Sequence, residues 1–406
     1  MNFASFSYRM GHGILPQSLF WIAALGSLTA AIFCGMAVAA ALRFAARKRC
    51  MLQKTELFTP PISVLKPLHG AEPGLAANLE SFFQQNYPAP YELIFCARRD
   101  EDAGLQVARA VAARYPNQPV RFLACGEPQF PNPKMYSLAV MSEAAMYSYQ
   151  ITSDADARVA PDALLRCVQS IAPGHTVNGR QVVLGSCLYI GDVDKGSLFT
   201  WLDAVGKSVE MGAGVLIADM LSGTDFALGP LQVLEKTTFA DAGGYDDLGH
   251  YWAEDFVLGN RLSQQGKGVE MCTHIIKLMV ADQGAMRSLR DQLRWMQSTR
   301  RSRPAGHLGT GLTFAMPFGL IGFASEAAFG NWYAAGVFLA IALMNRWVQA
   351  FTMLRVLGAE RIAFQTVIYP LRDLLGFLIW CGSYLPADTR YHGTRFRIMP
   401  NGRLEA

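Results

Sequence analysis

The sequence predicts an α/β domain with a mostly parallel sheet, flanked by one N-terminal and about three C-terminal transmembrane or re-entrant helices. Three observations lead to this fold class: an uncharged apolar run near the N-terminus, short apolar runs alternating with amphipathic segments in the middle, and a return to apolar sequence after Arg303. Hydrophobic residues make up 51% and charged residues 17% of the 406 residues, which is a low charge content for a soluble protein.

The first element is an uncharged run at 19–42, which is long enough to cross a hydrocarbon core of about 30 Å. Four basic residues follow it at once: Arg43, Arg47, Lys48 and Arg49. Because positive residues beside a span stay in the cytoplasm, 1–18 is expected outside and 43–59 is expected to be a basic cytosolic linker. A cleaved signal peptide is the alternative, but the run is long and its basic cluster lies on the wrong side.

The second element is a soluble domain at 60–303, in which predicted strands alternate with predicted helices. Short apolar or β-branched runs occur at 62–65, 92–97, 121–124 and 149–153, and amphipathic segments separate them at 74–84, 104–114 and 136–146. This alternation favours a parallel sheet, and such sheets bind ligands beyond the carboxyl ends of their strands.

The third element is the membrane part at 304–386, followed by a basic tail at 387–406. Its candidate spans or half-spans lie at 312–323, 332–344 and 364–385, and they are interrupted by Pro317, Arg346, Pro370, Arg372 and Asp373. A simple count of spans puts the tail outside, whereas its arginines favour the inside. We therefore expect one C-terminal segment to be re-entrant or interfacial, and Arg372 to neutralise Asp373.

The strongest candidate site is the acidic pair Asp154 and Asp156, directly after the predicted strand 149–153. Two carboxylates one residue apart at a strand end can hold one Mg²⁺ or Mn²⁺ ion, and a solvated turn is the alternative. Such an ion can neutralise a departing nucleotide diphosphate.

A second acidic pair, Glu254 and Asp255, lies between apolar residues just before a helix-like run at 256–263. A partly buried Asp255 could act as a general base, while a helix-start acid favoured by the helix dipole is the alternative.

Two weaker patterns could bind a donor molecule. Arg294 and Trp295 stand in a basic run before the membrane segments, where they could contact diphosphate and sugar or only anchor the chain to anionic lipid. Asp100, Glu101 and Asp102 follow the predicted strand 92–97 and could receive the nucleotide.

Charge and cysteine usage exclude other classes of function. The formal net charge of +4 is too small to argue for nucleic acid, and the eight cysteines show no zinc-binding spacing, so we expect reduced thiols in a cytosolic domain.

The ordered set of motifs resembles the ceramide glucosyltransferase family over nearly the whole chain. The motifs are Val64-Leu65-Lys66-Pro67-Leu68-His69-Gly70, Ser81-Phe82-Phe83-Gln84-Gln85-Asn86-Tyr87-Pro88, Asn132-Pro133-Lys134, Asp154 with Asp156, Ala253-Glu254-Asp255, Arg294-Trp295 and His392-Gly393-Thr394-Arg395-Phe396-Arg397. The stretch 64–75 and the sequence after Trp295 are also similar to bacterial hopanoid-associated glycosyltransferases.

The resemblance implies an inverting glycosyltransferase with a GT-A-like nucleotide-diphospho-sugar transferase domain and a UDP-sugar donor. It implies Asp154 and Asp156 as the metal site, Asp255 as the base, and Lys134, Asp154, Arg294 and Trp295 near the donor, with Asp100 or Asp102 as a further donor contact. Asp291 departs from the family, which has Gln or Arg at the first position of the Arg-Trp motif, so Asp291 receives no role.

The expected acceptor is a lipid, ceramide or a hopanoid, and the expected location is a bacterial inner membrane with the catalytic domain in the cytoplasm. Glucose is the expected sugar, and a hopanoid N-acetylglucosaminyltransferase is the alternative. A processive polysaccharide synthase and a non-catalytic sugar-nucleotide sensor are further alternatives.

Overall fold

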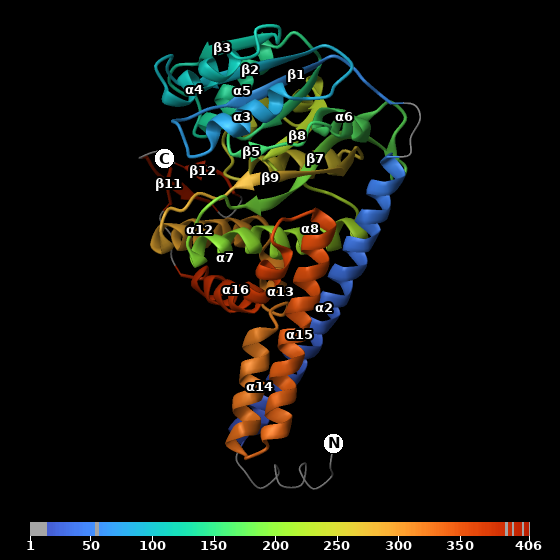
Figure 1. Cartoon of the computed structure of the whole chain (residues 1–406), viewed down its shortest axis with the longest axis vertical. Coiled ribbons are helices and arrows are strands. Elements are labelled where there is room, and N and C mark those ends of the chain that lie inside the picture. The colour runs from blue at the N-terminus through green and yellow to red at the C-terminus, as the bar shows by residue number, and fades with distance from the viewer. Residues whose placement is uncertain (1–13, 53–56, 386–388, 392–393, 400–401, 406) are drawn as a thin grey trace.

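The computed structural model describes residues 14–52, 57–385, 389–391, 394–399 and 402–405. An α/β domain occupies one end of the long axis, a helical layer lies beneath it, and a narrow helical bundle extends from the other side of that layer (Figure 1). Most of the predicted extracytoplasmic segment 1–18 lies outside the described residues.

The four predicted strands are confirmed and form one half of the main sheet. They are β1 (Ile62–Pro67), β2 (Tyr91–Ala97), β3 (Val120–Ala124) and β4 (Tyr149–Ser153), which pair in parallel in the order β3-β2-β1-β4. The helices α3 (Leu75–Phe83), α4 (Ala103–Ala112) and α5 (Pro133–Ala144) follow the first three strands, as predicted. Because β1, β2 and β4 are parallel, the loops after them meet at one edge of the sheet.

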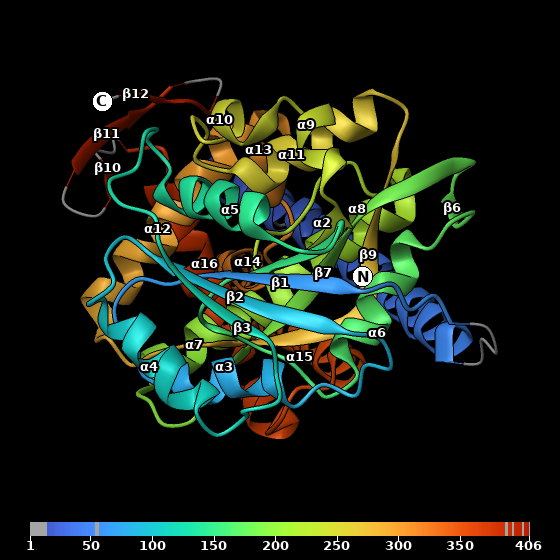
Figure 2. The ribbon, with the colours of Figure 1, turned by 90° about the horizontal axis from the view of Figure 1, so that it is seen from above.

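The other half of the sheet is mixed, so the parallel pattern holds only for the N-terminal part of the domain. The strand β8 (Leu231–Glu235) runs antiparallel between β4 and β7 (Arg180–Asp192), and β9 (Gly268–Met279) runs parallel to β7. The short strands β5 (Ala157–Arg158) and β6 (Thr176–Val177) pair antiparallel with β9 and β7. Figure 2 shows the resulting sheet from above.

Short helices surround this half of the sheet. They are α6 (Ala163–Val168), η1 (Gln169–Ile171), α9 (Thr237–Asp241), α10 (Gly244–Leu248) and α11 (Glu254–Gln264). The helix predicted at 256–263 is therefore α11, and it begins at the acidic pair itself.

A helical layer separates the sheet from the bundle (Figure 1). It contains α7 (Leu198–Val205), the π-helical turn η2 (Gly206–Met211), α8 (Gly212–Ser222), α12 (Ala285–Ser302) and α13 (Pro304–Thr310). The basic run that precedes the membrane segments forms α12, which carries a polar face and a narrow apolar face.

The N-terminal helix α2 (Ile14–Leu52) is longer than the predicted span, so the first half of the predicted linker 43–59 is helical. Arg47 lies in this extension, where its Nη1 is 3.2 Å from Asp219 Oδ2 and its Nη2 donates to the Met271 carbonyl. The basic end of the helix is thus fixed directly to the α/β domain.

Three helices in the described part of the chain are long and apolar enough to cross a membrane: 17–51 of α2, α15 (Trp332–Leu357) and α16 (Ile362–Gly382). The intervening helix α14 (Met316–Ala328) has 13 residues and packs beside α2 and α15. In Figure 1 the helices α2, α14 and α15 run together along the bundle, whereas α16 lies crosswise beneath α12 and α7. Helix α16 therefore runs across the bundle although it is long and apolar enough to cross a membrane.

Two predicted interruptions do not interrupt the helices. Helix α15 continues through Arg346 to Leu357, and α16 continues through Pro370. Arg346 is tolerated there because it is buried against Asp373.

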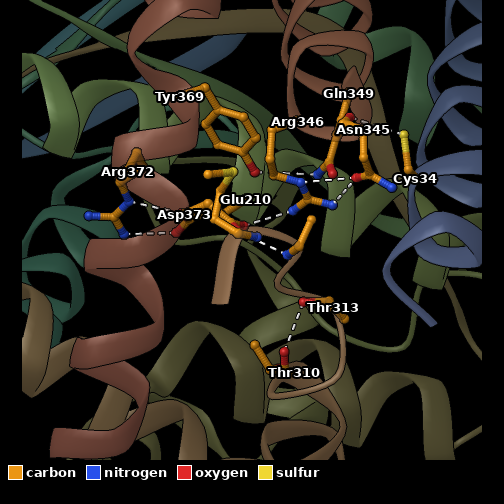
Figure 3. A network of polar contacts seen from close by, with 12 residues as sticks. Cys34, Glu210, Thr310, Thr313, Asn345, Arg346, Gln349, Tyr369, Arg372 and Asp373 are labelled. Atoms are coloured by element: carbon orange, nitrogen blue, oxygen red, sulfur yellow. Dashed lines mark hydrogen bonds and ion pairs between the residues drawn. The ribbon is translucent and has the colours of Figure 1, made fainter. Parts of the chain in front are cut away.

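The predicted mutual pairing of Arg372 with Asp373 is wrong. Arg346 Nη1 lies 2.8 Å from Asp373 Oδ1, with both side chains at most 2% exposed, and Arg372 binds the carboxylate of Glu210 at 2.7 and 2.9 Å (Figure 3). Successive residues of a helix point about 100° apart, so Arg372 and Asp373 reach different neighbours.

The described part of the tail forms β10 (Thr389–Tyr391), β11 (Thr394–Ile398) and β12 (Leu404–Glu405). It returns to the α/β domain, where Leu404 N donates to His250 O at 2.7 Å and Trp252 N donates to Gly402 O at 3.1 Å. The tail therefore lies against the segment that leads into α11.

Candidate active site

The acidic pair after β4 lies in a tight turn between two strands of the sheet. Asp154 and Asp156 occupy the residues between the end of β4 and the start of β5, and Asp154 N donates to Pro230 O at the start of β8. Burial and repulsion by Asp154 and Glu72 raise the pKa of Asp156 to about 7. The turn thus concentrates negative charge at the carboxyl end of β4.

Lys134 connects this turn to the second acidic pair. Its Nζ is 2.7 Å from Asp154 Oδ1 and 3.3 Å from Glu254 Oε1. Burial alone would lower the pKa of Lys134, but the two carboxylates outweigh burial and raise it. Lys134 is therefore a permanent cation between the acids that the sequence singled out separately.

Asn132 explains why the Asn132-Pro133-Lys134 motif folds as it does. Its Oδ1 caps α5 by accepting from the amides of Lys134 and Met135, and Pro133 fits the first helical position, where no amide donor is needed. Its Nδ2 donates to Glu254 Oε2 at 3.2 Å. One residue thus starts the helix and holds the neighbouring acid.

Asp255 stands at the start of α11 beside Lys134. A methyl group added at Gly229 would lie 3.0 Å from Asp255 Oδ2 and 3.3 Å from Lys134 Nζ, so both groups border the same small space. Burial and repulsion by Glu254 raise the pKa of Asp255 to about 6, against the attraction of Lys134. A carboxylate with this pKa can accept a proton near neutral pH.

Lys66 is a buried cation beside the acidic turn, and the sequence analysis gave it no role. It is fully buried at the end of β1, and its Nζ donates to Asp154 O at 2.7 Å and Ser153 Oγ at 3.1 Å. Burial lowers the pKa of Lys66 to about 7, opposed by Asp154 and Asp156. The lysine near the carboxyl end of the short, mostly apolar strand 62–67 could have indicated this role in the sequence.

The acidic turn after β2 lies at the same edge of the sheet, but within the described part of the chain no hydrogen bond or ion pair joins it to the acidic pairs. Asp102 accepts hydrogen bonds from Gly104 N and Gly70 N, so it caps α4 and fixes the loop after β1. Asp100 is largely exposed and pairs with Arg109 at 2.5 Å. Asp102 therefore holds the loop after β1. Glu72 in this loop is one of the charges that raise the pKa of Asp156.

The Arg-Trp motif lies on α12, and its arginine packs against Trp252, two residues before Glu254 in the chain. The Arg294 guanidinium is 5.5 Å from the Trp252 ring centroid, and Lys207 Nζ is 5.5 Å from the Trp295 ring centroid. Asp291 pairs with Arg294, while Gln292 donates to Ser288 and accepts from Arg372. Gln292 thus points toward α16.

The acidic turn suits a hard divalent cation. Asp154 and Asp156 supply oxygen ligands, and the repulsion that raises the pKa of Asp156 would be relieved by a cation between them. The residues present therefore fit Mg²⁺ or Mn²⁺ at Asp154 and Asp156.

A cysteine cluster was not visible in the sequence spacing. Cys167, Cys187 and Cys272 converge in the core with their sulfurs within 4.8 Å of one another. A methyl group at Gly185 would collide with Cys272 and Ser170, so the cluster is close-packed.

Several known proteins are similar to this chain. Ceramide glucosyltransferase 1 of Caenorhabditis elegans is 27% identical over 215 residues, 53% of this chain and 44% of that protein. Ceramide glucosyltransferase 3 of the same organism is 22% identical over 86% of this chain and 75% of that protein. The chain thus spans less than half the length of the first of these relatives and three quarters of the second.

Among solved structures, a mannosyltransferase from Pyrobaculum calidifontis in complex with GDP-Man and Mn²⁺ has a TM-score of 0.49 and 16% identity, covering 88% of this chain and 99% of that chain. The model of the family described as "Glycosyl transferase family 21" matches residues 20–404, which include both acidic pairs, the Arg-Trp motif and the membrane helices. The resemblance inferred from the motifs is thereby confirmed: the chain belongs to glycosyl transferase family 21.

Proposed function

We propose that the protein is a membrane-bound inverting glycosyltransferase that transfers a sugar from a UDP-sugar to a lipid hydroxyl. The observation that carries this proposal is the convergence of Asp154, Lys134, Glu254 and Asp255, because Asp154 belongs to the acidic turn that would bind a divalent cation and Asp255 is a carboxylate with a raised pKa. The ceramide glucosyltransferases among its relatives support a lipid acceptor.

The proposed reaction is a single displacement at the anomeric carbon. The acceptor oxygen bonds to that carbon, its proton passes to Asp255, and the bond from the anomeric carbon to the diphosphate oxygen breaks with release of UDP. Lys134 contacts Asp154 and borders the same space as Asp255, so it can stabilise charge on the diphosphate. A divalent cation held by Asp154 and Asp156 would supply further charge neutralisation when bound.

Glucose is the proposed sugar and ceramide the proposed acceptor, with N-acetylglucosamine and a hopanoid as the alternative pair. The relatives named ceramide glucosyltransferase favour the first pair. Lys134, Arg294 and Trp295 are the proposed donor contacts, together with Asp154 and either Asp100 or Asp102.

We place the catalytic domain and the tail in the cytoplasm of a bacterial inner membrane. Arg47 joins the basic end of α2 to the α/β domain, and the tail pairs with the same domain at His250 and Trp252. The end of α2 and the tail bind the same domain, so both must lie on one side of the membrane. This is possible if α14 and α15 cross the membrane and return as a hairpin while α16 lies across the bundle.

The packing of the bundle disfavours a processive polysaccharide synthase. A methyl group at Gly319 would collide with Ala342, and one at Gly322 would collide with Phe338, so α14 and α15 are in close contact. The described bundle helices thus leave little room for a polymer between them.

The decisive test is Asp255→Asn in the full-length protein. We expect sugar transfer to fall about 10²–10⁴-fold, the usual contribution of a general base, while UDP binding is kept. Asp246→Asn, an exposed acid in α10, is the matched control. Wild-type turnover in Asp255→Asn would refute the base assignment, and mass spectrometry of lipids from cells with and without the chain would identify sugar and acceptor.

A further inference from the structure

A polar cavity of about 700 Å³ lies between one edge of the sheet and the turn that joins α15 to α16. Its walls come from the last strands of the sheet, β9 and β5, from the starts of α3 and α7, and from the start of α16. Its volume is in the range of roughly 300–1,000 Å³ that is typical of ligand pockets. None of the acids of the candidate active site is among its lining residues, so the cavity is a separate place in the described part of the chain.

The cavity stands where a candidate membrane-crossing helix ends. Helix α15 is long and apolar enough to cross a membrane, and it ends at Leu357, three residues before Glu360 in the cavity wall. Trp201 of α7 also lines the cavity, and its ring packs edge-on against Phe364 of α16 with 5.4 Å between the ring centroids. Tryptophan is typical of the boundary between membrane and water. We therefore expect the cavity at the level of the lipid headgroups.

Two cations stand side by side on the strands of this wall. Arg158 in β5 pairs directly with Lys277 in β9, and both side chains line the cavity. Like charges directly opposite one another on two strands repel, and an anion beside them relieves the repulsion. Lys277 Nζ donates to Glu360 Oε1 at 2.5 Å, and this bond, followed by the charges of Arg361 and Arg158, lowers the pKa of Glu360. The wall thus gathers three cations around one exposed carboxylate.

The acids of the cavity are mostly engaged, whereas most of its cations are free. The lining contains four basic and four acidic side chains. Asp192 and Glu360 share Lys277, and Asp282 accepts hydrogen bonds from the backbone and side chain at the start of α7. Within the described residues, four charged side chains of the lining form no ion pair: Arg158, Lys195, Arg361 and Asp194. Three cations and one acid are therefore available to a ligand.

The backbone holds Arg361 in a conformation that few arginines adopt. Its φ is 50°, one of two positive φ values among the non-glycine residues in the described part of the chain. Its guanidinium lies over the Trp201 ring, 5.2 Å from the centroid, so the side chain is held at the cavity wall. Backbone strain of this kind is concentrated at sites that clamp ligands.

A phosphate group fits the free charges of the cavity. Guanidinium groups bind phosphate oxygens through paired hydrogen bonds, and a lysine adds a further point charge. Asp194 can accept a hydrogen bond from a hydroxyl or ammonium group on the same ligand. At the end of a membrane helix, the molecule that carries a phosphate together with such a group is a phospholipid.

We propose that the cavity between β5, β9 and the start of α16 binds the phosphate-bearing headgroup of a membrane phospholipid, with Arg158, Lys195 and Arg361 as the phosphate contacts. The site is independent of the proposed reaction, because it contains none of the residues assigned to that reaction. A bound headgroup would connect the α/β domain to the turn between α15 and α16 and so fix the domain on the membrane surface.

The test measures binding of dihexanoyl-phosphatidylglycerol to the full-length protein in detergent by native mass spectrometry. Arg158→Gln and Arg361→Gln each remove a guanidinium from the cavity, and Lys195→Gln removes an exposed ammonium from a loop. Arg355→Gln is the matched control, because Arg355 is an exposed arginine in the last turn of α15 that does not line the cavity. Melting curves confirm that each protein is folded, and Lys195→Gln replaces any arginine variant that is not.

We expect one saturably bound molecule in the wild type. Loss of one charge-assisted contact should raise its Kd about tenfold in Arg158→Gln and Arg361→Gln and about threefold in Lys195→Gln, with no change in Arg355→Gln. Dihexanoylglycerol, which lacks the phosphate, and inorganic phosphate, which lacks the lipid, should each bind at least about tenfold more weakly. UDP should not displace the bound lipid.

A wild-type Kd in the cavity variants overturns the assignment, and so does an equal loss of binding in Arg355→Gln, which would indicate general attraction to headgroups. Equal binding of dihexanoylglycerol excludes recognition of a phosphate. Equal binding of inorganic phosphate overturns the lipid as its source, and displacement by UDP would assign the cavity to the sugar donor instead.

Discussion

The candidate active site and the contact between α15 and α16 both keep charged side chains largely away from water, but they balance the charges differently. Beside the membrane helices, Arg346 pairs with Asp373 and Arg372 with Glu210, so the charges match one to one. In the candidate active site, the carboxylates are in excess, and burial and mutual repulsion raise the pKa values of Asp156 and Asp255.

The carboxylates in question are Asp154, Asp156, Glu254 and Asp255, and they share Lys66 and Lys134. A balanced group of buried charges can only hold the helices in place, because it has no capacity for another ion. An unbalanced group can take up a cation or a proton, which is what the proposed reaction requires. The comparison thus separates structural from functional charges within one chain.

The largest effect is expected from breaking the balanced group. Asp373→Ala leaves Arg346 buried without its partner and also removes the acceptor of the Ala315 and Met316 amides at the start of α14. Loss of one partner of a buried pair costs about 3–5 kcal/mol, so the unfolding temperature in detergent should fall steeply. The double change Arg346→Met with Asp373→Leu should recover most of that loss. An Asp373→Ala protein as stable as the wild type would contradict a structural role for the pair.

The reverse pattern is expected at the acidic turn. Asp156→Asn removes one of two repelling carboxylates, so the unfolding temperature should stay the same or rise. Sugar transfer should nevertheless fall at least about a hundredfold, because charge stabilisation of the leaving diphosphate is lost. Melting curves and transfer rates on the same preparations test this. A destabilisation as large as that of Asp373→Ala would contradict the distinction between structural and functional charges.

The pH dependence of transfer sharpens the role of Asp255. The base must be deprotonated to accept the acceptor's proton, and its pKa is about 6, so kcat/KM should fall about tenfold for each pH unit below about 6. Glu254→Gln removes the repulsion that helps to raise this pKa and should move the acidic limb to lower pH. A limb that does not move in Glu254→Gln would show that another group titrates there.

The smallest effect is expected from the tail. Arg403 Nη2 is 3.0 Å from Asp247 Oδ1, and both side chains are more than one-third exposed. Exposed pairs contribute about 0.2–1 kcal/mol, so Arg403→Ala should change transfer less than about fivefold. Deleting residues 399–406 also removes the backbone contacts to His250 and Trp252 and should lower transfer further, with little change in melting. Identical rates for the deletion and the wild type would exclude a role of the tail in ordering the segment before α11.

Local sequence patterns were sufficient for the elements of the first half of the domain and for the acidic residues at their ends. The strands β1 to β4 and the helices between them follow from apolar periodicity, and Asp154 with Asp156 follows from its position after a buried strand. The strands and helices are predicted correctly because hydrophobic pattern and turn chemistry act over a few neighbouring residues.

Only the tertiary structure decided which of these residues meet. The contact of Lys134 with Asp154 and Glu254, the burial of Lys66 beneath Asp154, the antiparallel insertion of β8 and the crosswise course of α16 depend on segments far apart in the chain. Arg372 and Asp373 illustrate the reason: adjacent opposite charges suggest a pair, but the helical rotation between them turns each toward a separate partner that no local pattern specifies.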